Sequence, residues 1–403
     1  MEMKREWFGV MASLSIVALV GGCSSRIDDL LREAAKGHHN QGGEHEPGHS
    51  AGGSRGTDAS AGAGGARSAD GGTAGVGGAA GGSTGSGGAS GTSTDGGLAC
   101  ATNALTTCAG TMSGPWCVDD HFFADGDPAF PEFKGVWSGG PNDTWVVGDE
   151  LAADQMTLLG FAFHWDGCTW LPSPLPTIAS LNGVWGAAAD DVWATSDQGV
   201  LHWDGTTWSA VSVGTPGNFG AISGSSATNV WVVGSTGFFH WDGNVWATAA
   251  PGGGQAGADI WAVAPDDVWA TTNGPNVSHW DGSTWTVTEA AEFTNFGLFA
   301  IWADADSAWA VGEGRQIAHL TGGTWTHVQP PGGSSKGLSD VMSLGADVYA
   351  VGQAVMHSTS GTTFETDTDV PQSANYNGVW LTPSQVWLAG GTGTGAVVVH
   401  RAR

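Results

Sequence analysis

The chain has 403 residues, of which 68 are glycine and 22 are tryptophan, and it carries a formal net charge of −27 at pH 7. From residue 113 onward there are 29 Asp and Glu residues but only five Lys and Arg residues, so this part carries about −24. Nucleic acid and anionic membrane surfaces are therefore poor binding partners for this acidic region.

A signal peptide is predicted for residues 1–22. Lys4 and Arg5 precede an apolar run from Trp7 to Val20. This run is too short to span a bilayer as a helix, and its length and charged start are typical of secretory signals.

The residues at the end of this run resemble a bacterial lipobox. Small residues precede Cys23 in the sequence LVGGCSS, residues 19–25. The resemblance implies that Cys23 is lipidated, and several acyl chains on one residue anchor a protein durably. Because Ser24 follows the cysteine, it also implies an outer-membrane lipoprotein that faces the periplasm or the cell surface. An ordinary secretory signal followed by an unrelated cysteine is the alternative.

A lipid-anchored, disordered tether is predicted for residues 23–98. Residues 26–50 are rich in His and Glu, which allows either a metal site or a solvated linker. We favour the linker, because nothing in this tract defines a coordination geometry. Residues 51–97 are almost entirely Gly, Ala, Ser and Thr, and such a composition cannot bury a core. As a flexible coil this stretch spans on the order of 40 Å.

Four cysteines follow Cys23, namely Cys100, Cys108, Cys117 and Cys168. An even number of cysteines in a chain that leaves the cytoplasm predicts two disulfides. Three pairings are open, and we favour one in which Cys168 joins the N-terminal segment to the first repeat. The CxxC spacing of zinc ribbons and redox motifs is absent, so no metal site is predicted from these thiols.

Residues 99–403 are predicted to form an all-β, seven-bladed β-propeller. A window at residues 182–213 returns with the same pattern at residues 221–250 and 259–287, a period near 40 residues. Each period contains four short β-rich stretches separated by Gly, Asp and Asn turns. Four such stretches describe a small antiparallel sheet, which is the unit of a propeller blade.

Aromatic residues and histidines mark each repeat at fixed places. The first stretches carry Trp137, Trp185, Ser223, Trp261, Trp302, Met342 and Trp380. The second stretches carry Trp145, Trp193, Trp231, Trp269, Trp309, Tyr349 and Trp387. The third stretches carry His164, His202, His240, His279, His319, His357 and His400, and the fourth carry Trp170, Trp208, Trp246, Trp285, Trp325 and Phe364. We expect the tryptophans to be structural and to stack between blades.

The last repeat lacks a fourth stretch, because the chain stops soon after the third. Upstream of the first repeat, SGPWCV at residues 113–118 is similar to the segments that begin fourth strands, and it contains Trp116. We predict that the segment from about Ser113 to Asp119 completes the last blade as its outer strand. Such a closure leaves few open sheet edges.

The HWDG-x-x-W element of the repeats resembles two propeller signatures, the Trp-Asp dipeptide of WD-repeats and the Asp box of sialidase-like propellers. The Asp-box pattern S-x-D-x-G-x-x-W is matched only in part, since Asp and Gly are adjacent here. The resemblance implies a Trp-rich propeller without assigning it to one family. The acidic residues of this element are predicted to form hairpin turns rather than to act as catalytic acids; they are Asp166, Asp204, Asp242 and Asp281.

The seven histidines allow two interpretations, a ring of metal ligands or neutral side chains hydrogen-bonded to turns. Residues in different blades are held too far apart to share one ion, so we predict the second. No metal and no cofactor are therefore predicted.

Ligand-binding candidates lie where the repeats differ. In a propeller the loops from second to third strands, and from fourth to the next first strand, share one face, and here these loops are the irregular ones. We call this the variable face. The candidates are Lys134, Glu150, Asp154, Asp259, Asn273, Asn295, Arg315, Asp340, Asn375 and Tyr376. Of these, Lys134, Asp259 and Asp340 are expected to reach the central channel.

The function predicted from these observations is non-catalytic binding or scaffolding. We expect a monomer, tethered to the cell envelope, that recognises a protein or a glycan there and no nucleic acid. No GxSxG, HExxH or phosphate-loop motif is present, and Arg315 alone cannot supply the arginine triad of sialidases. The alternative is a glycoside hydrolase or lyase that uses carboxylates on the variable face, which two carboxyl groups facing each other across one cleft would support. A role in envelope assembly is a third possibility.

Overall fold

The structure is a computed structural model that describes residues 108, 110–123, 130–154, 156–177, 179–249, 251, 256–272, 274–289, 297–331 and 337–403. The predicted signal peptide, the lipidation site Cys23 and the tether lie outside these residues, as do Cys100, Asn273 and Asn295. Within the described residues no helix is long and apolar enough to cross a membrane.

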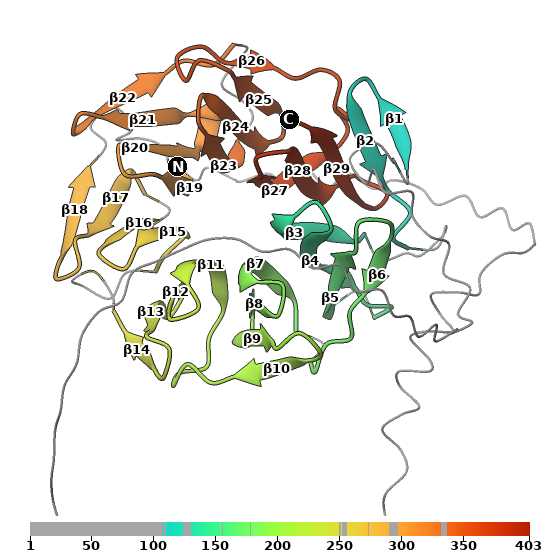
Figure 1. The fold of residues 1–403 in the computed structure, drawn as a ribbon, viewed down its shortest axis with the longest axis horizontal. Coiled ribbons are helices and arrows are strands. Elements are labelled where there is room, and N and C mark those ends of the chain that lie inside the picture. Colours follow the sequence, from blue (N-terminus) through green and yellow to red (C-terminus); the bar gives the residue numbers. More distant parts are fainter. Residues whose placement is uncertain are drawn as a thin grey trace, which may run out of the picture. The chain divides into compact units, whose positions relative to one another are not determined.

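Seven antiparallel sheets are arranged as a ring of blades (Figure 1). Blades 1 to 3 consist of β3 (Glu132–Gly140), β4 (Asp143–Leu151), β5 (Leu158–Trp165), β6 (Trp170–Pro172); β7 (Leu181–Ala188), β8 (Asp191–Ser196), β9 (Val200–Trp203), β10 (Trp208–Val211); and β11 (Phe219–Ser226), β12 (Asn229–Gly234), β13 (Gly237–Trp241), β14 (Trp246–Thr248). Each blade pairs its four strands in chain order.

Blades 4 to 6 repeat this arrangement. They consist of β15 (Asp259–Ala264), β16 (Asp267–Thr271), β17 (Asn276–Trp280), β18 (Trp285–Glu289); β19 (Leu298–Ala303), β20 (Ser307–Gly312), β21 (Ile317–Thr321), β22 (Thr324–Val328); and β23 (Leu338–Leu344), β24 (Asp347–Gly352), β25 (Val355–Ser358), β26 (Glu365–Thr366). A short 3₁₀ helix, η1 (Glu313–Arg315), lies between β20 and β21.

Blade 7 joins the two ends of the described chain. It contains β27 (Asn375–Leu381), β28 (Gln385–Gly391) and β29 (Ala396–Ala402), followed in the sheet by β2 (Trp116–Asp119) and β1 (Thr111–Ser113). The first strand of each blade lies toward the middle of the ring and the last toward its rim (Figure 1). The predicted seven-bladed β-propeller is therefore confirmed.

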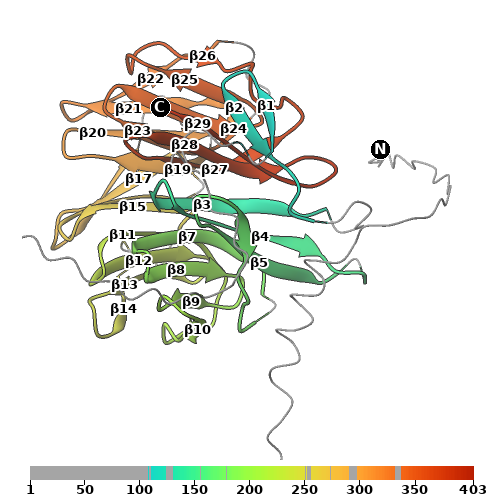
Figure 2. The ribbon, with the colours of Figure 1, turned by 45° about the vertical axis from the view of Figure 1, so that its right-hand side comes forward.

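The closure of the ring is also confirmed, with one difference. β2 pairs antiparallel with β29, so that Cys117 lies opposite His400 (Figure 2). Ser113, however, belongs to β1, a strand that the sequence analysis did not predict and that forms a hairpin with β2. Gly114 adopts a φ of 55° between the two strands, a conformation that glycine accepts without strain. The N-terminal segment thus adds two strands to blade 7 rather than one.

Disulfides fix this N-terminal segment. Cys108, which precedes β1, is bonded to Cys117 in β2. Cys168, in the turn after β5, is also disulfide-bonded. Because Cys100 lies outside the described residues, the role of Cys168 in joining the N-terminal segment to blade 1 stays a prediction.

Aromatic rings connect every blade to the next. The second-strand ring of each blade packs edge-on against the fourth-strand ring of the following blade, with centroid distances of 5.3 to 6.4 Å and interplanar angles of 76° to 89°. The pairs are Trp145–Trp208, Trp193–Trp246, Trp231–Trp285, Trp269–Trp325, Trp309–Phe364, Tyr349–Trp116 and Trp387–Trp170. Each pair adds about 0.5–1.5 kcal/mol beyond the burial of its apolar area. The predicted role of the tryptophans between blades is confirmed at each of these contacts.

The third-strand histidines cover the other side of the same rings. Each stacks on the second-strand ring of its own blade, with centroids 3.7 to 4.4 Å apart. In five blades its Nε2 is hydrogen-bonded at 2.7 to 3.4 Å to an Asp or Asn at the start of the second strand. Burial lowers the pKa of His240, His319 and His357, which favours the neutral ring. The histidines therefore stabilise the blades, as predicted, and the acceptors are side chains rather than turn carbonyls.

The Asp-Gly turns between third and fourth strands are built as predicted. Asp166, Asp204, Asp242 and Asp281 each accept hydrogen bonds from the backbone N–H groups two and three residues further on, at 2.7 to 2.9 Å. Hydrogen bonds to the ionised form lower the pKa of Asp204 to about 2. These carboxylates are turn formers.

Candidate functional site

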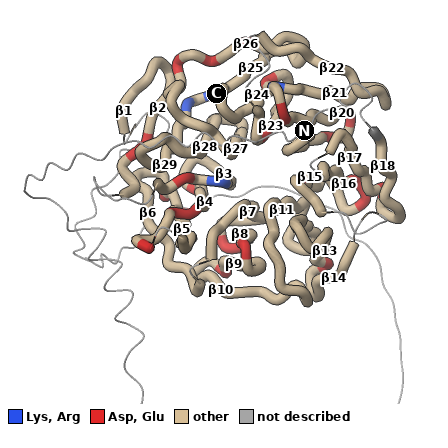
Figure 3. Tube along the Cα trace, turned by 180° about the vertical axis from the view of Figure 1, so that it is seen from behind, with Lys and Arg blue, Asp and Glu red and all other residues tan. Residues whose placement is uncertain are grey.

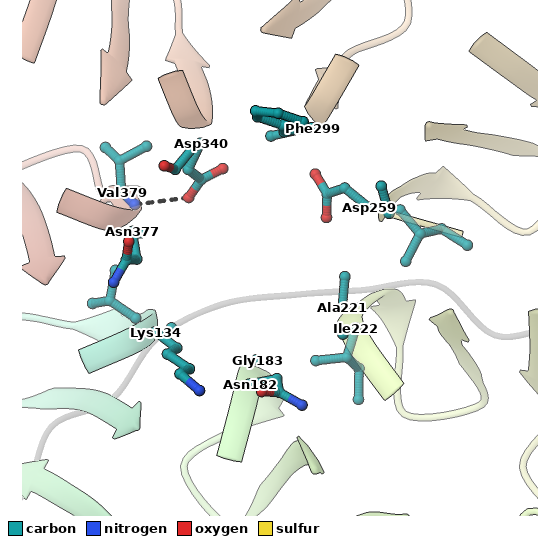
Figure 4. Close-up of a pocket in the computed structure, with 18 of the residues that line it drawn as sticks. Lys134, Asn182, Gly183, Ala221, Ile222, Asp259, Phe299, Asp340, Asn377 and Val379 are labelled. Carbon is teal, nitrogen blue, oxygen red and sulfur yellow. Dashed lines mark hydrogen bonds between the residues drawn. The ribbon is translucent and has the colours of Figure 1, made fainter. Parts of the chain in front are cut away.

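A pocket of about 180 Å³ lies where the seven first strands surround the central channel (Figure 4). Two rings of side chains line it, counted from the first-strand tryptophan position of each blade. The outer ring stands three residues before that position and consists of Lys134, Asn182, Gly220, Ala258, Phe299, Ser339 and Asn377. The inner ring stands two residues before it and consists of Gly135, Gly183, Ala221, Asp259, Ala300, Asp340 and Gly378. We call this cavity the channel pocket.

A β-bulge allows both rings to reach the pocket. In six of the first strands the register shifts at the residue of the outer ring, as at Lys134, which lies between Phe133 and Gly135. A bulge inserts an extra residue, so that the alternation of side chains between the two faces of the sheet is interrupted. Consecutive residues can then both line the channel.

The inner ring is small because the strands approach closely there. A Cβ added at Gly135 would lie 3.1 Å from the backbone of Gly183 and Val184 in the next blade. Asp259 and Asp340 are therefore exceptional in a ring of Gly and Ala. Figure 4 shows both carboxyl groups in the pocket, with Phe299 between their blades.

Both carboxyl groups are held by backbone N–H groups of the following blade. Oδ2 of Asp259 accepts a hydrogen bond from the N–H of Ile301 at 2.8 Å. Oδ2 of Asp340 accepts one from the N–H of Val379 at 2.8 Å, and its Oδ1 accepts one from Val341 at 2.7 Å. The two aspartates thus join neighbouring blades and present their remaining lone pairs to the pocket.

The environment of this pair disfavours two negative charges. Burial raises the pKa of Asp259 to about 7. Burial, together with the nearby charge of Asp259, raises the pKa of Asp340 well above its ordinary value. Burial therefore favours the protonated form of both carboxyl groups.

Lys134 is the cation of the pocket lining, but its charge is already paired. Its Nζ forms an ion pair with Asp149, which is 3 % exposed, and lies 3.3 Å from Oγ of Ser180. Ser180 donates a hydrogen bond to the same carboxylate. This network fixes Lys134 between blades 1 and 2 and neutralises its charge.

The floor of the pocket is aromatic. The rings of Trp261 in blade 4 and Trp380 in blade 7 meet with their centroids 5.8 Å apart. Trp302 and Trp137 extend this contact, 6.2 Å from Trp261 and 6.5 Å from Trp380 respectively. Blades 4 and 7 lie on opposite sides of the channel (Figure 1), so the contact between Trp261 and Trp380 spans it.

Three polar residues of the lining were not predicted, namely Asn182, Ser339 and Asn377. Nδ2 of Asn182 donates to the carbonyl of Phe219 at 2.9 Å, and Nδ2 of Asn377 donates to the carbonyl of Phe133 at 2.8 Å. Each therefore joins its blade to the next. Their shared register with Lys134, three residues before the first-strand tryptophan, is the signal by which they could have been found.

The remaining predicted residues do not line the pocket. Exposed Asp154 accepts hydrogen bonds from Met156 and Thr157 within its loop, and these hydrogen bonds lower its pKa. Arg315 donates to the carbonyl of Pro331 at 2.9 Å, and Glu150 lies in β4 away from the lining residues.

Two further candidates lie at the beginning of β27. Nδ2 of Asn375 donates to Oδ1 of Asn377 at 3.0 Å, so Asn375 supports a residue of the lining. Tyr376 is only 1 % exposed, and its hydroxyl donates to the carbonyl of Pro371 at 3.3 Å. Tyr376 is thus a core residue and not a ligand contact, because the strand start that carries it is packed between blades.

One other cluster combines metal-binding side chains. Cys117, Asp119 and His400 bring their ligand atoms within 4.8 Å of one another at the closure of the ring. The Sγ of Cys117 is bonded to Cys108, so it is not a thiolate ligand here. Nε2 of His400 lies 3.5 Å from Asp119, whose Oδ2 also accepts the Nε1–H of Trp170 at 3.1 Å. The cluster therefore stabilises the closure.

The chemistry available in the pocket is limited. Its charged side chains are Lys134, Asp259 and Asp340, and the described lining includes no histidine, cysteine or tyrosine. A Ser–His or Cys–His pair is thus absent from this lining, and any catalysis there would depend on the carboxyl groups of Asp259 and Asp340. Figure 3 shows acidic positions spread around the ring and few basic ones.

No protein-family model and no curated protein sequence matches this chain. Solved structures with a similar fold include YCF48 bound to a D1 peptide, 19 % identical, with a TM-score of 0.55 over 74 % of this chain and 100 % of that one. Virginiamycin B lyase from Staphylococcus aureus is 14 % identical, with a TM-score of 0.58 over 71 % and 99 %. The extracellular domain of a putative one-component system from B. thetaiotaomicron is 12 % identical, with a TM-score of 0.52 over 68 % and 40 %. At these identities the likeness shows the fold alone.

Proposed function

We propose that this chain is a non-catalytic binding propeller that presents its variable face to a protein or a glycan at the cell envelope. The channel pocket carries this proposal. It combines fixed hydrogen-bond acceptors, small walls and an aromatic floor, and its described lining contains no histidine or cysteine. Such convergence of a few polar groups in a concave site is typical of ligand recognition.

The similar structures support a binding role without assigning a ligand. One is described as bound to a D1 peptide, and another is the extracellular domain of a putative one-component system. Propellers with this fold thus include proteins that bind a peptide and proteins that act outside the cell. A protein is accordingly the first partner class to test for this chain.

Attachment to the outer membrane is part of the same proposal. The lipobox-like sequence before Cys23 and the Gly-rich composition of residues 51–97 support a lipid-anchored propeller on a long tether. A tether of this kind suits a monomer that reaches for a partner in the envelope.

The experiment is a search for ligands with the full-length chain, as bait for solubilised envelope proteins and on a glycan array. We expect a specific ligand that is lost when Met156, 84 % exposed in the variable-face loop between β4 and β5, is changed to Glu. Val245→Glu is the matched control, since Val245 is 59 % exposed in a β13–β14 turn on the opposite face. A bait that captures nothing specific in either format would contradict the proposal.

A glycoside hydrolase or lyase is the second candidate, because Asp259 and Asp340 share one pocket. Two carboxyl groups with separated pKa values can act as acid and base. A volume of about 180 Å³, below the roughly 300 to 1,000 Å³ of ordinary ligand pockets, suits a single side chain or small group better than a sugar chain, which argues against the enzyme. Turnover of a polysaccharide or aryl glycoside that falls by about 10²-fold or more in Asp259→Asn would establish the enzyme.

A further inference from the structure

The uncompensated charge of the channel pocket is negative. Asp259 and Asp340 each receive hydrogen bonds from backbone N–H groups, and no ion pair to either is found among the described residues. Lys134, the basic residue of the lining, is neutralised by Asp149 behind it. A ligand that fills the pocket therefore meets two carboxyl groups without a counter-charge.

The apolar part of the pocket suits a cation as well. Trp261 and Trp380 line the pocket below the carboxyl groups with their rings in mutual contact. Aromatic faces attract ammonium and guanidinium groups, and the attraction strengthens where water is excluded. Apolar residues such as Ile260 and Val379 lie between the inner ring and this aromatic floor, and they suit an alkyl chain.

We propose that the channel pocket binds an organic cation, an ammonium or guanidinium group, through Asp259 and Asp340 above the Trp261–Trp380 floor. This inference rests on the proposed binding function and names its ligand class. The cation is carried either by a small amine or guanidine or by a Lys or Arg side chain of a protein partner. Three residues of strand, about 10 Å, separate the outer ring from the tryptophans, so the channel pocket is deep enough for such a side chain.

A hard metal ion fits these residues less well. Calcium takes six to eight oxygen ligands, and magnesium takes six in near-ideal octahedral geometry. The described pocket offers two carboxyl groups whose oxygens already accept backbone hydrogen bonds. The amide groups of Asn182 and Asn377 are engaged with neighbouring carbonyls through their Nδ2. An N–H donor needs only the remaining lone pairs of the carboxyl oxygens.

The protonation of Asp259 and Asp340 makes the affinity for a cation depend on pH. The titratable groups facing the site are Asp259, Asp340 and Lys134, with Asp149 behind the lysine. Without a ligand, burial keeps the pKa of Asp259 at about 7 and raises that of Asp340 well above its ordinary value. A bound cation favours the ionised carboxylates, so binding releases a proton and tightens as the pH rises.

The test is isothermal titration of the full-length chain with N-acetyl-arginine amide, with the neutral isostere N-acetyl-citrulline amide as the control ligand. We expect saturable binding of the arginine compound and an affinity for the citrulline compound that is lower by about tenfold or more. Between pH 6 and pH 8 the affinity for the arginine compound should rise, by up to about tenfold per pH unit for one released proton. Arginine keeps its charge throughout this range, so the change reports the pocket.

Matched variants test whether the arginine compound binds in the channel pocket. Asp259→Asn and Asp340→Asn keep an oxygen that accepts the neighbouring N–H. Each variant should lower the affinity for the arginine compound by about tenfold, while thermal unfolding remains cooperative. Asp154→Asn makes the same chemical change outside the pocket and should leave the affinity unchanged. Equal binding of arginine and citrulline compounds overturns the inference, as does unchanged affinity in both pocket variants. Saturable binding of calcium chloride without binding of the arginine compound also overturns it.

An acetylated pentapeptide with a central arginine separates the two sources of the cation. Tighter binding of the peptide than of the arginine amide indicates a protein side chain, whereas equal affinity indicates a small free cation, and either result supports the cation pocket. Failure of this inference is distinguishable from failure of the proposed function. If the envelope or glycan search yields a ligand that both Asp→Asn variants still bind, the cation pocket is wrong and the binding function stands.

Discussion

Trp116 packs edge-on against Tyr349, with 6.3 Å between the ring centroids and 88° between the ring planes. The two residues are far apart in the sequence, yet this contact repeats the geometry found between every other pair of neighbouring blades. The Nε1–H of Trp116 also donates to Oδ2 of Asp367 at 3.1 Å, and the guanidinium of Arg401 lies 4.7 Å from its ring centroid. This tryptophan therefore closes the ring of blades.

Replacing Trp116 should open that closure. Trp116 is fully buried, so Trp116→Ala removes a large side chain and leaves a cavity, which costs about 3–5 kcal/mol of unfolding free energy. Urea denaturation followed by circular dichroism measures the loss. Met112→Ala, 63 % exposed in β1, is the control and should cost less than about 0.5 kcal/mol. If the two variants unfold at the same urea concentration, the closure does not stabilise the fold.

The Cys108–Cys117 disulfide should stabilise the same end of the chain. It closes a short loop, with a sequence separation of nine residues, for which the loss of chain entropy corresponds to about 2–3 kcal/mol. The double variant Cys108→Ala/Cys117→Ala leaves Cys168 intact and should lower the urea midpoint accordingly. Because the variant also fills less volume at Cys117, an oxidised and a reduced sample of the unaltered chain provide the second comparison. An unchanged midpoint in both would contradict the prediction.

The aspartates at the starts of second strands should contribute more to folding stability than their exposed neighbours do. Asp191 accepts hydrogen bonds from Nε1 of Trp193 at 2.8 Å and is paired with Nε2 of His202 at 2.7 Å. Asp191→Ala leaves two polar groups without a partner, at a cost of about 1–3 kcal/mol each when they are buried. Asp190→Ala, exposed at the adjacent position, is the control. Equal thermal stability of the two variants would show that the His–Asp–Trp contacts add nothing.

Stability should depend on pH through the pair in the channel. The raised pKa of Asp259, about 7 in the folded chain against an ordinary 3.8, means that the folded state binds a proton that the unfolded state has released. The stability from this proton is fully present below about pH 4 and is lost as the pH rises through about 7. Asp259→Asn/Asp340→Asn should therefore be more stable than the unaltered chain at pH 8 by at least about 1 kcal/mol, and less so at pH 5. Denaturation at the two pH values measures this, and parallel shifts of both proteins would exclude the pair as the cause.

Lipidation is tested at Cys23. Cys23→Ser removes the residue that the lipobox-like sequence presents for modification, so the chain should move from the membrane fraction to the soluble fraction after cell lysis. Incorporation of labelled fatty acid into the unaltered chain, and not into the variant, provides the chemical evidence. Ser25→Ala is the neighbouring control. A Cys23→Ser chain that still sediments with membranes would favour an uncleaved or otherwise bound protein.

Most of the fold could be predicted from the sequence because each blade repeats the same local pattern. The tryptophan and histidine positions define the strands, and Trp116, outside the seven repeats, indicated how the ring closes. β1 was missed because it has only three residues, Thr111–Ser113, and alternation over so short a stretch does not define a strand. The disulfide to Cys117 and pairing with β2, rather than local propensity, stabilise it.

The candidate site was predictable only in part. Asp259 and Asp340 could be named because they stand near the starts of first strands, which were expected to approach the central channel. Asn182 and Asn377 were overlooked although they share a register with Lys134, because a bulge decides that this position reaches the channel. Tyr376 was placed on the surface because it follows a loop, whereas the structure buries it against Pro371. Burial at the start of a strand depends on the neighbouring blade, which the repeat pattern does not describe.

The central claim, that the variable face and its channel pocket bind a partner, is tested most directly by site-specific photocrosslinking in envelope preparations. The photoreactive residue p-benzoylphenylalanine is placed at Phe299 in the pocket, at Met156 on the variable face and at Val245 on the opposite face. We predict a discrete crosslinked product from Phe299 and Met156, reduced by excess N-acetyl-arginine amide at Phe299, and none from Val245. Products from Val245 alone, or equal labelling from all three positions, would contradict the account.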